Sequence, residues 1–278
     1  MRIVDDLVKV SRLGEDSSET GLLSHAAMQR SLDTIRELVG RAKSLGAAEI
    51  IAVGTQAMRT SRNADEFIGM VRSECGVEIR VISGDEEAAL SFLAVSGMVE
   101  DEIRVFDVGG GSSEIAHGVR DRVSYRRSVP VGALSLFGKF FQRYGDAAIP
   151  GDALDEACRY VGGMLENIMP ARGEDTRCVG IGGTVATLAA VYLGHASGNA
   201  ERPCGTTLSL DEIAGQIKMY AGMPASARKF IPGLPPERAD IILPGGCIIS
   251  ELMKSGKFTT LTAIDRGLRH GLMEKLLG

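Results

Sequence analysis

The apolar positions of the chain follow two periods that alternate along the sequence. Short runs rich in β-branched residues predict strands, and stretches with apolar residues three and four positions apart predict helices. We expect strands at residues 3–12, 49–53, 77–82, 103–107, 113–118, 122–129, 178–181 and 258–263. We expect helices at residues 24–45, 61 or 63 to 75, 85–99, 134–144, 151–169, 185–193 and 210–221, with Ser24 as the N-cap of the first. This alternation predicts an α/β fold.

The strand and helix pattern restarts near residue 102. We therefore expect two α/β lobes, residues 1–101 and 102–278, joined at residues 99–102. No low-complexity tract or flexible linker marks the joint. The length of 278 residues with 44% hydrophobic residues is enough for two compact cores.

The composition of the chain mainly excludes classes of protein and of site. The chain has 31 basic and 36 acidic residues, and this mildly acidic balance argues against bulk nucleic-acid binding. The five cysteines and four histidines are scattered, which argues against a zinc site and predicts buried free thiols in a reducing compartment. The sequence shows neither a signal peptide nor a run of about 20 apolar residues, so we expect a cytoplasmic globular protein without membrane contact.

The most informative segment joins a hydrophobic strand to a glycine triplet, two hydroxyl residues and a glutamate. Its residues are Asp107, Gly109, Gly110, Gly111, Ser112, Ser113 and Glu114. Glycines without a Cβ let backbone N–H groups approach an anion, and both serines can donate to phosphate oxygens. Asp107 and Glu114 are suited to a hard cation such as Mg²⁺. The alternative is a glycine-rich hairpin with a capping aspartate.

A second glycine turn precedes the helix expected from Val185. Gly182, Gly183 and Thr184 follow a short strand, and the N–H groups of a helix start attract anions. Taken alone, this signal is weak, because glycine turns before helices are common. The sequence contains neither the dinucleotide-binding glycine pattern nor the P-loop pattern.

Charged residues in two further segments could have either a structural or a chemical role. Glu86 and Glu87 lie in the first turn of an expected helix, where acids favour the helix dipole by about 0.3–1 kcal/mol. A glutamate there could also orient and deprotonate a water. Arg59 and Arg62 follow a buried strand, and the planar guanidinium suits phosphate, although surface solvation is the default role.

These segments, in this order, resemble the exopolyphosphatase/guanosine pentaphosphate phosphohydrolase (Ppx/GppA) family of the actin-like ATPase (ASKHA) superfamily. The resemblance covers residues 12–14, 54–59, 83–88, 107–114, 180–184, 234–240, 244–246 and 265–271, and so nearly the whole chain. It implies two actin-like, ribonuclease H-like lobes with a cleft between them, and a homodimer. Family members split the terminal phosphoanhydride of inorganic polyphosphate or of pppGpp, and the sequence leaves both substrates open.

The resemblance also implies roles for single residues. Glu87 matches the base that activates water, and Arg59 matches an arginine that contacts phosphate. Asp107 and Glu114 match carboxylates that help to hold Mg²⁺, and the string between them matches the second phosphate loop.

Two departures from the family pattern concern the ends of the chain. The chain ends at Gly278, which corresponds to the short, two-lobe form. The Asp-x-Gly-Ser/Thr-Asn-Ser first phosphate loop and its two strands are not found near Met1. Such strands would bury enough apolar surface to rival the net stability of a domain, about 5–15 kcal/mol. We therefore expect a misassigned start codon or a truncated chain.

Three functions follow from these observations. The leading one is a Mg²⁺-dependent phosphoanhydride hydrolase. The second is a small-molecule kinase of the same superfamily, which the pair of glutamates at the helix start disfavours. The third is a catalytically impaired protein that binds polyphosphate or (p)ppGpp without turnover.

Overall fold

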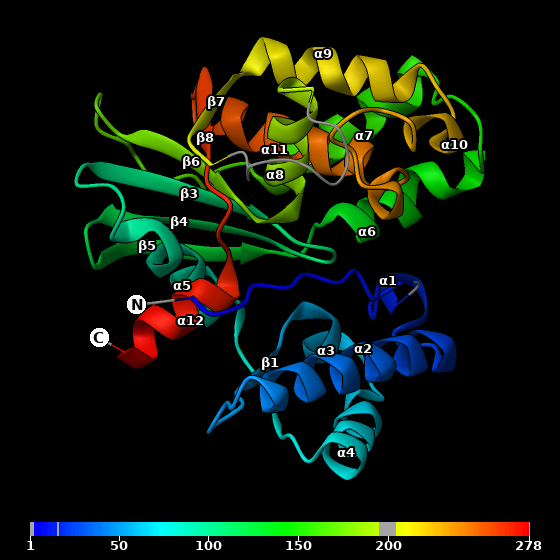
Figure 1. The fold of residues 1–278 in the computed structure, drawn as a ribbon. Helices are drawn as coiled ribbons and strands as arrows, with labels where there is room; N and C mark the ends of the chain where they lie inside the picture. The colour runs from blue at the N-terminus through cyan, green and yellow to red at the C-terminus, as the bar shows by residue number, and fades with distance from the viewer. Residues whose placement is uncertain (1–2, 16, 195–203, 278) are drawn as a thin grey trace. The chain divides into compact units, whose positions relative to one another are not determined.

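The computed structural model describes residues 3–15, 17–194 and 204–277 of the chain (Figure 1). The chain divides into two compact units, Met1–Ser83 and Gly84–Gly278. From the sequence we expected this division between residues 101 and 102. The observed division comes earlier because the apolar side chains of helix α5 (Gly84–Ser96) belong to the core of the second unit.

The first unit contains two parallel strands and four described helices. Strand β1 (Ala52–Gly54) pairs with β2 (Ile79–Val81). The helices are α1 (Ser17–Thr20), α2 (His25–Ser44), α3 (Gln56–Thr60) and α4 (Ala64–Cys75). Ser24 is the N-cap of α2, as predicted, and its Oγ accepts a hydrogen bond of 3.2 Å from the Ala27 N–H. The core of this unit is formed mainly by α2 and α4, with Leu32, Phe67 and Val71 fully buried.

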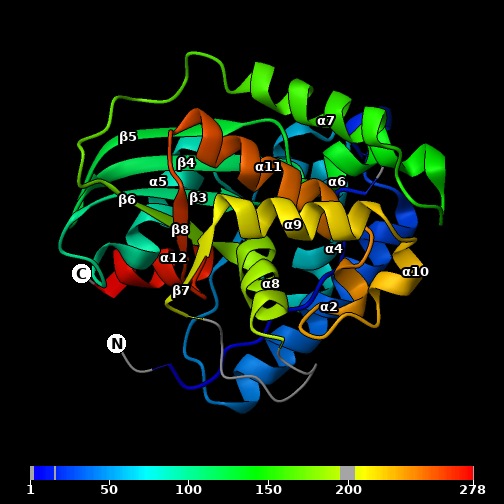
Figure 2. The same cartoon turned by 90° about the horizontal axis from the view of Figure 1, so that it is seen from above.

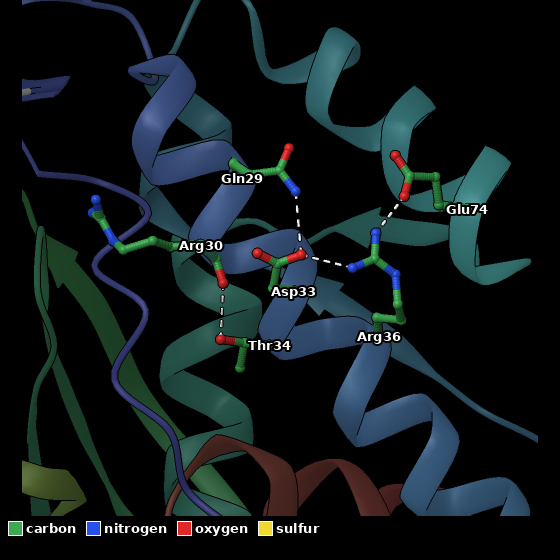
Figure 3. A network of polar contacts seen from close by, with 6 residues as sticks. All are labelled: Gln29, Arg30, Asp33, Thr34, Arg36 and Glu74. Atoms are coloured by element: carbon green, nitrogen blue, oxygen red, sulfur yellow. Dashed lines mark hydrogen bonds and ion pairs between the residues drawn. The ribbon is translucent and has the colours of Figure 1, made fainter.

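Polar side chains on the solvent side connect α2 to α4 (Figure 3). Asp33 Oδ1 accepts hydrogen bonds from Gln29 Nε2 at 3.2 Å and from Arg36 Nη1 at 2.6 Å. Arg36 also forms an ion pair with Glu74 on α4. These groups are exposed, and pairs of this kind contribute about 0–1 kcal/mol each. The network therefore adds little to the stability that the apolar α2–α4 contact provides.

The predicted strand at residues 3–12 is wrong. This segment has no regular secondary structure, and Ile3, Val4, Leu7 and Val8 are all exposed. Alternation stabilises a strand only where a neighbour pairs with its backbone and a core covers one face. Here the segment runs alongside α2 instead, and Asp5 Oδ2 lies 2.8 Å from Arg41 Nε.

The second unit is built on a six-stranded mixed sheet with the order β5-β4-β3-β6-β8-β7. Its strands are β3 (Glu102–Val108), β4 (Ser113–Val119), β5 (Arg122–Val129), β6 (Arg177–Ile181), β7 (Thr206–Ser209) and β8 (Thr260–Ala263). Strands β3, β6 and β8 run parallel to one another. Strands β4, β5 and β7 are antiparallel to their neighbours. The carboxyl ends of the three parallel strands therefore meet at one edge.

Helices cover both faces of this sheet (Figures 1 and 2). Helix α5 lies on one face, together with α12 (Leu268–Leu277), and packs against Ile103 and Val105. Phe106 and Val108 point to the other face, because side chains alternate along a strand. That face is covered by α6 (Ala133–Leu136), α7 (Gly151–Met164), α8 (Gly182–Tyr192), α9 (Leu210–Ala221) and α11 (Ile242–Ser255). A short helix, α10 (Ala225–Arg228), and a 3₁₀ turn at Pro236–Arg238 connect α9 to α11.

Several elements differ from the sequence-based prediction. The helix expected at 134–144 consists of α6, a π-helix at Phe137–Phe141 and a 3₁₀ turn at Gln142–Tyr144. Strand β7 and helices α1, α3, α10, α11 and α12 were not predicted. Helix α11 escaped prediction because Pro244 and two glycines normally interrupt helices. Pro244 lies in the first turn, where its missing N–H has no intrahelical partner to lose.

The cysteines are all free thiols, as expected, although only three of them are buried. Cys204 is exposed and Cys158 is half-buried. Among the described helices, none combines the length and the apolar stretch that crossing a membrane requires.

Candidate functional site

The predicted site residues of the second unit gather at the carboxyl edge of its parallel strands. Asp107 is the register partner of Glu114 on β4 and of Ile181 at the end of β6. The glycine triplet connects β3 to β4, and Gly182 follows β6 directly. Strand pairing thus brings together two motifs that lie about seventy residues apart in the sequence.

The glycine triplet forms a tight turn that is fixed against the start of α6. The Gly109 N–H donates to the Ser112 carbonyl at 3.0 Å, and the Gly110 carbonyl accepts from the Leu134 N–H at 2.8 Å. A Cβ on Gly132 would lie 2.5 Å from the carbonyl carbon of Gly110. The turn therefore depends on direct backbone-to-backbone contact, which a glycine at position 132 permits.

The two serines of this segment are both buried, and the hydroxyl of Ser113 already has a partner. Ser113 Oγ donates to the Val131 carbonyl at 2.6 Å. The hydroxyl proton that we expected to reach a phosphate is thus engaged in holding the turn. The Ser112 side chain is engaged as well, in a hydrogen bond with Glu114. The phosphate-binding role of this segment remains a prediction that rests mainly on the backbone of the glycines.

The carboxylates at this edge come from three elements. Glu114 is 2% exposed, and Glu87, in the first turn of α5, is 8% exposed. Ser91 Oγ donates to Asp107 Oδ2 at 2.8 Å, and Ser128 Oγ donates to Glu114 Oε1 at 2.7 Å. Burial raises the pKa of Glu114 well above its usual value, and the charges of Glu87 and Asp107 raise it further. Burial also raises the pKa of Asp107.

This arrangement fits a divalent cation that takes only part of its ligands from the protein. Within the described ranges, no group of three or more metal-ligating side chains is placed to hold an ion by itself. Asp107 and Glu114 are nevertheless neighbouring, desolvated carboxylates whose mutual repulsion a cation would relieve. Mg²⁺ is typically bound by one or two carboxylates, with waters and substrate phosphates as the other ligands.

The second glycine turn lies between a carboxylate and a guanidinium. Gly182 has φ +78°, and a Cβ there would come closer than 3.0 Å to Asp107 Oδ1. A Cβ on Gly183 would come equally close to the guanidinium nitrogens of Arg238. Helix α8 begins at Gly182 instead of near Val185, so that both glycines and Thr184 form its first turn. The Gly182 N–H donates to the Arg266 carbonyl at 3.1 Å, so that the predicted anion-binding role rests on the N–H groups that follow it.

Arg238 is a candidate site residue that was not predicted from the sequence. It lies in the 3₁₀ turn at Pro236–Arg238, more than fifty residues from Gly183, and its guanidinium covers the first turn of α8. The segment 234–240 drew attention only through the family resemblance. No local pattern indicates which of its charges contacts the glycine turn, because the contact is made through the tertiary structure.

Arg59 lies in the first unit, on α3. Its Nη1 donates to the Ile82 carbonyl at 3.0 Å, so that the side chain connects α3 to the residue after β2. Its predicted contact with phosphate stays a prediction.

Neutralising Glu114 is expected to stabilise the chain in chelator-containing buffer. The folded-state pKa lies above the unfolded value, so the folded state binds more protons and stability falls as pH rises above the usual value of 4.5. We expect Glu114→Gln to be more stable than wild type by about 1–3 kcal/mol near pH 8, and by less near pH 5. Urea unfolding at the two pH values measures the difference. The exposed Glu166→Gln is the control, and equal shifts for the two variants would contradict the prediction.

Solved structures and a family model both resemble this chain over nearly its whole length. The crystal structure of the Ppx/GppA family member of Aquifex aeolicus covers 97% of this chain and 87% of its own, with a TM-score of 0.79 and 26% identity. The expected α/β fold is therefore confirmed as the Ppx/GppA fold. The model of the Ppx/GppA phosphatase family matches residues 1–278, and the chain belongs to this family.

Two curated relatives differ in name and in length. Exopolyphosphatase 1 of Mycobacterium leprae is 28% identical over 96% of this chain and 79% of its own. The guanosine-5'-triphosphate,3'-diphosphate pyrophosphatase of Aeromonas hydrophila is 28% identical over 100% of this chain. The chain spans only 55% of the length of that relative.

Proposed function

We propose that this chain is a hydrolase that releases the terminal phosphate of inorganic polyphosphate or of pppGpp. The observation that carries the proposal is the pair of carboxylates, Asp107 and Glu114, placed between two glycine turns at one sheet edge. The family membership and the names of the two relatives support the same chemistry.

The terminal phosphate would bind to backbone N–H groups, for which the protein supplies two sets. The turn at Gly109–Gly111 carries one set, and the first turn of α8 carries the other, with the positive end of the helix dipole behind it. Arg238 adds a guanidinium beside Gly183, which can donate two parallel hydrogen bonds to phosphate oxygens. Because both turns are fixed by backbone contacts, the donors would need little reorganisation as charge develops.

Glu87 is the base of the proposed reaction. It would accept a proton from a water and direct the oxygen toward the phosphorus, in line with the scissile bond. It lies beside the buried Glu114, and the charge of Glu87 adds to the burial that raises the pKa of Glu114. Asp107 and Glu114 would hold Mg²⁺, which, when bound, neutralises charge on the phosphates.

The experiment is an assay of phosphate release with long-chain polyphosphate and with pppGpp, in Mg²⁺ and in chelator. We expect release from at least one substrate, and its loss in chelator would support the metal. ADP-dependent phosphate uptake instead of release would indicate the kinase alternative. Binding of tripolyphosphate without release would indicate the binding protein. Size-exclusion chromatography with light scattering would test the expected homodimer.

A further inference from the structure

Arg228 is a buried arginine whose guanidinium binds backbone carbonyls. It is the last residue of α10 and is 3% exposed. Its Nε donates to the Tyr220 carbonyl at 2.8 Å, and its Nη2 donates to the Met223 carbonyl at 3.1 Å. Its Nη1 donates to the Ala239 carbonyl at 3.1 Å. One side chain therefore joins the end of α9 to the residue that directly follows Arg238.

The segment that carries Arg238 meets α8 at two places. Gly233 has φ +85°, and a Cβ there would come closer than 3.0 Å to the backbone of Ala190, near the end of α8. Arg238 meets Gly183 at the start of the same helix. The segment thus runs alongside α8 from the last turn of that helix to its first turn. The placement of the segment decides where the guanidinium of Arg238 lies.

The other end of the Arg228 contact is fixed to α8 as well. Gln216 Nε2 donates to the Leu188 carbonyl of α8 at 3.0 Å, and Tyr220 Oη donates to Gln216 Oε1 at 2.7 Å. Tyr220 is fully buried. The chain of hydrogen bonds from Leu188 through Gln216 and Tyr220 to Arg228 therefore sets the Ala239 carbonyl relative to α8.

We propose that Arg228 is a positioning residue for phosphate binding, because it holds the segment 229–241 so that Arg238 covers the first turn of α8. This inference rests on the proposed function. Three carbonyls in different directions match the planar fork of a guanidinium, whereas a lysine ammonium on its flexible stem offers one point charge. A lysine at this position keeps the charge and loses the geometry.

The test compares Arg228→Lys, Arg238→Ala and the double variant in the phosphate-release assay. We expect Arg228→Lys to raise KM about 10-fold, which corresponds to about 1.4 kcal/mol, and to change kcat less. In the Arg238→Ala background the same substitution should change KM less than about 2-fold, because the contact that it positions is already absent. Full additivity of the two effects would overturn the proposal.

The matched control is Arg104→Lys. Arg104 is 1% exposed and donates to the Ala171 carbonyl at 3.1 Å, so that the substitution also removes a buried guanidinium from a carbonyl. It should lower the melting temperature without an effect on KM that depends on Arg238. Hydrogen exchange of the substrate-free protein gives a readout that needs no activity. Arg228→Lys should accelerate exchange in residues 229–241, and Arg104→Lys should not.

This last measurement separates the two proposals. Failure of the wild-type chain to bind or hydrolyse both polyphosphate and pppGpp would contradict the proposed function, while hydrogen exchange would still decide whether Arg228 holds the segment. Unchanged exchange in residues 229–241 in Arg228→Lys would overturn the positioning role even if the chain is an active hydrolase.

Discussion

Replacement of Glu87 by glutamine is expected to lower kcat for phosphate release by a factor of about 10²–10⁴, the usual contribution of a positioned general base. Glutamine has nearly the same volume and cannot accept the proton of the attacking water. The side chain is 8% exposed, close to Glu114, so that water in bulk solution cannot readily replace it. KM should change far less than kcat, because the substitution leaves both glycine turns intact.

The neighbouring residue provides the control for this prediction. Glu86 lies in the same turn of α5, but its Oε1 is 3.2 Å from Lys275 Nζ in an exposed ion pair. Glu86→Gln should reduce kcat less than about 3-fold, since surface ion pairs contribute about 0–1 kcal/mol and the Glu86 carboxylate is already paired with Lys275. Comparable losses in the two variants would show that the charge of this helix start, and not a base at Glu87, supports the reaction.

The largest stability effect is expected at Gly271, where α12 crosses α5. A Cβ there would come closer than 3.0 Å to the carbonyl oxygen and carbon of Leu90. Both atoms belong to the backbone of a buried helix, so no side chain can rotate away. We expect Gly271→Ala to destabilise the chain by about 3 kcal/mol, the upper end of the usual cost of overpacking. Urea unfolding measures this change.

Gly215→Ala is the matched control for helix propensity. Gly215 lies within α9, and nothing lies within 4 Å of a Cβ at that position. The same substitution should there stabilise the chain by about 0.5–1 kcal/mol. Destabilisation of similar size at both positions would contradict the argument that close helix contact, and not glycine itself, decides the sign. Because Leu90 is one turn after Glu87 on α5, Gly271→Ala should also lower activity.

The sequence predicted those elements whose signals are local. Helix α9 begins and ends where the periodicity placed it, because Ser209 and Glu212 form a reciprocal capping box in front of an amphipathic run. Strand β5 matches its predicted range of 122–129. In contrast, residues 3–12 carry the alternation of a strand, but a strand needs a neighbour to pair with, and that requirement is not local.

Among the residues of the candidate site, too, only those with a local signal could be predicted from the sequence. The string from Asp107 to Glu114 indicated an anion-binding turn because its residue types and their spacing are contiguous. The contact of Arg238 with Gly183 could not be predicted, since it depends on the route of the segment 229–241 along α8. The same holds for Arg228, for which no local pattern indicates a role and which the structure buries among three carbonyls.

The sequence by itself determined the α/β class, most helices and strands, the two glycine turns and the carboxylates that flank the first turn. Only the tertiary structure decided that α5 belongs to the second unit and that Arg238 covers the second turn. It also placed Asp107 against Gly182. The physical reason is that periodicity, caps and glycine strings act over a few residues, whereas these contacts join segments many residues apart. Such contacts form only when the strands of one sheet and the helices on its faces pack together.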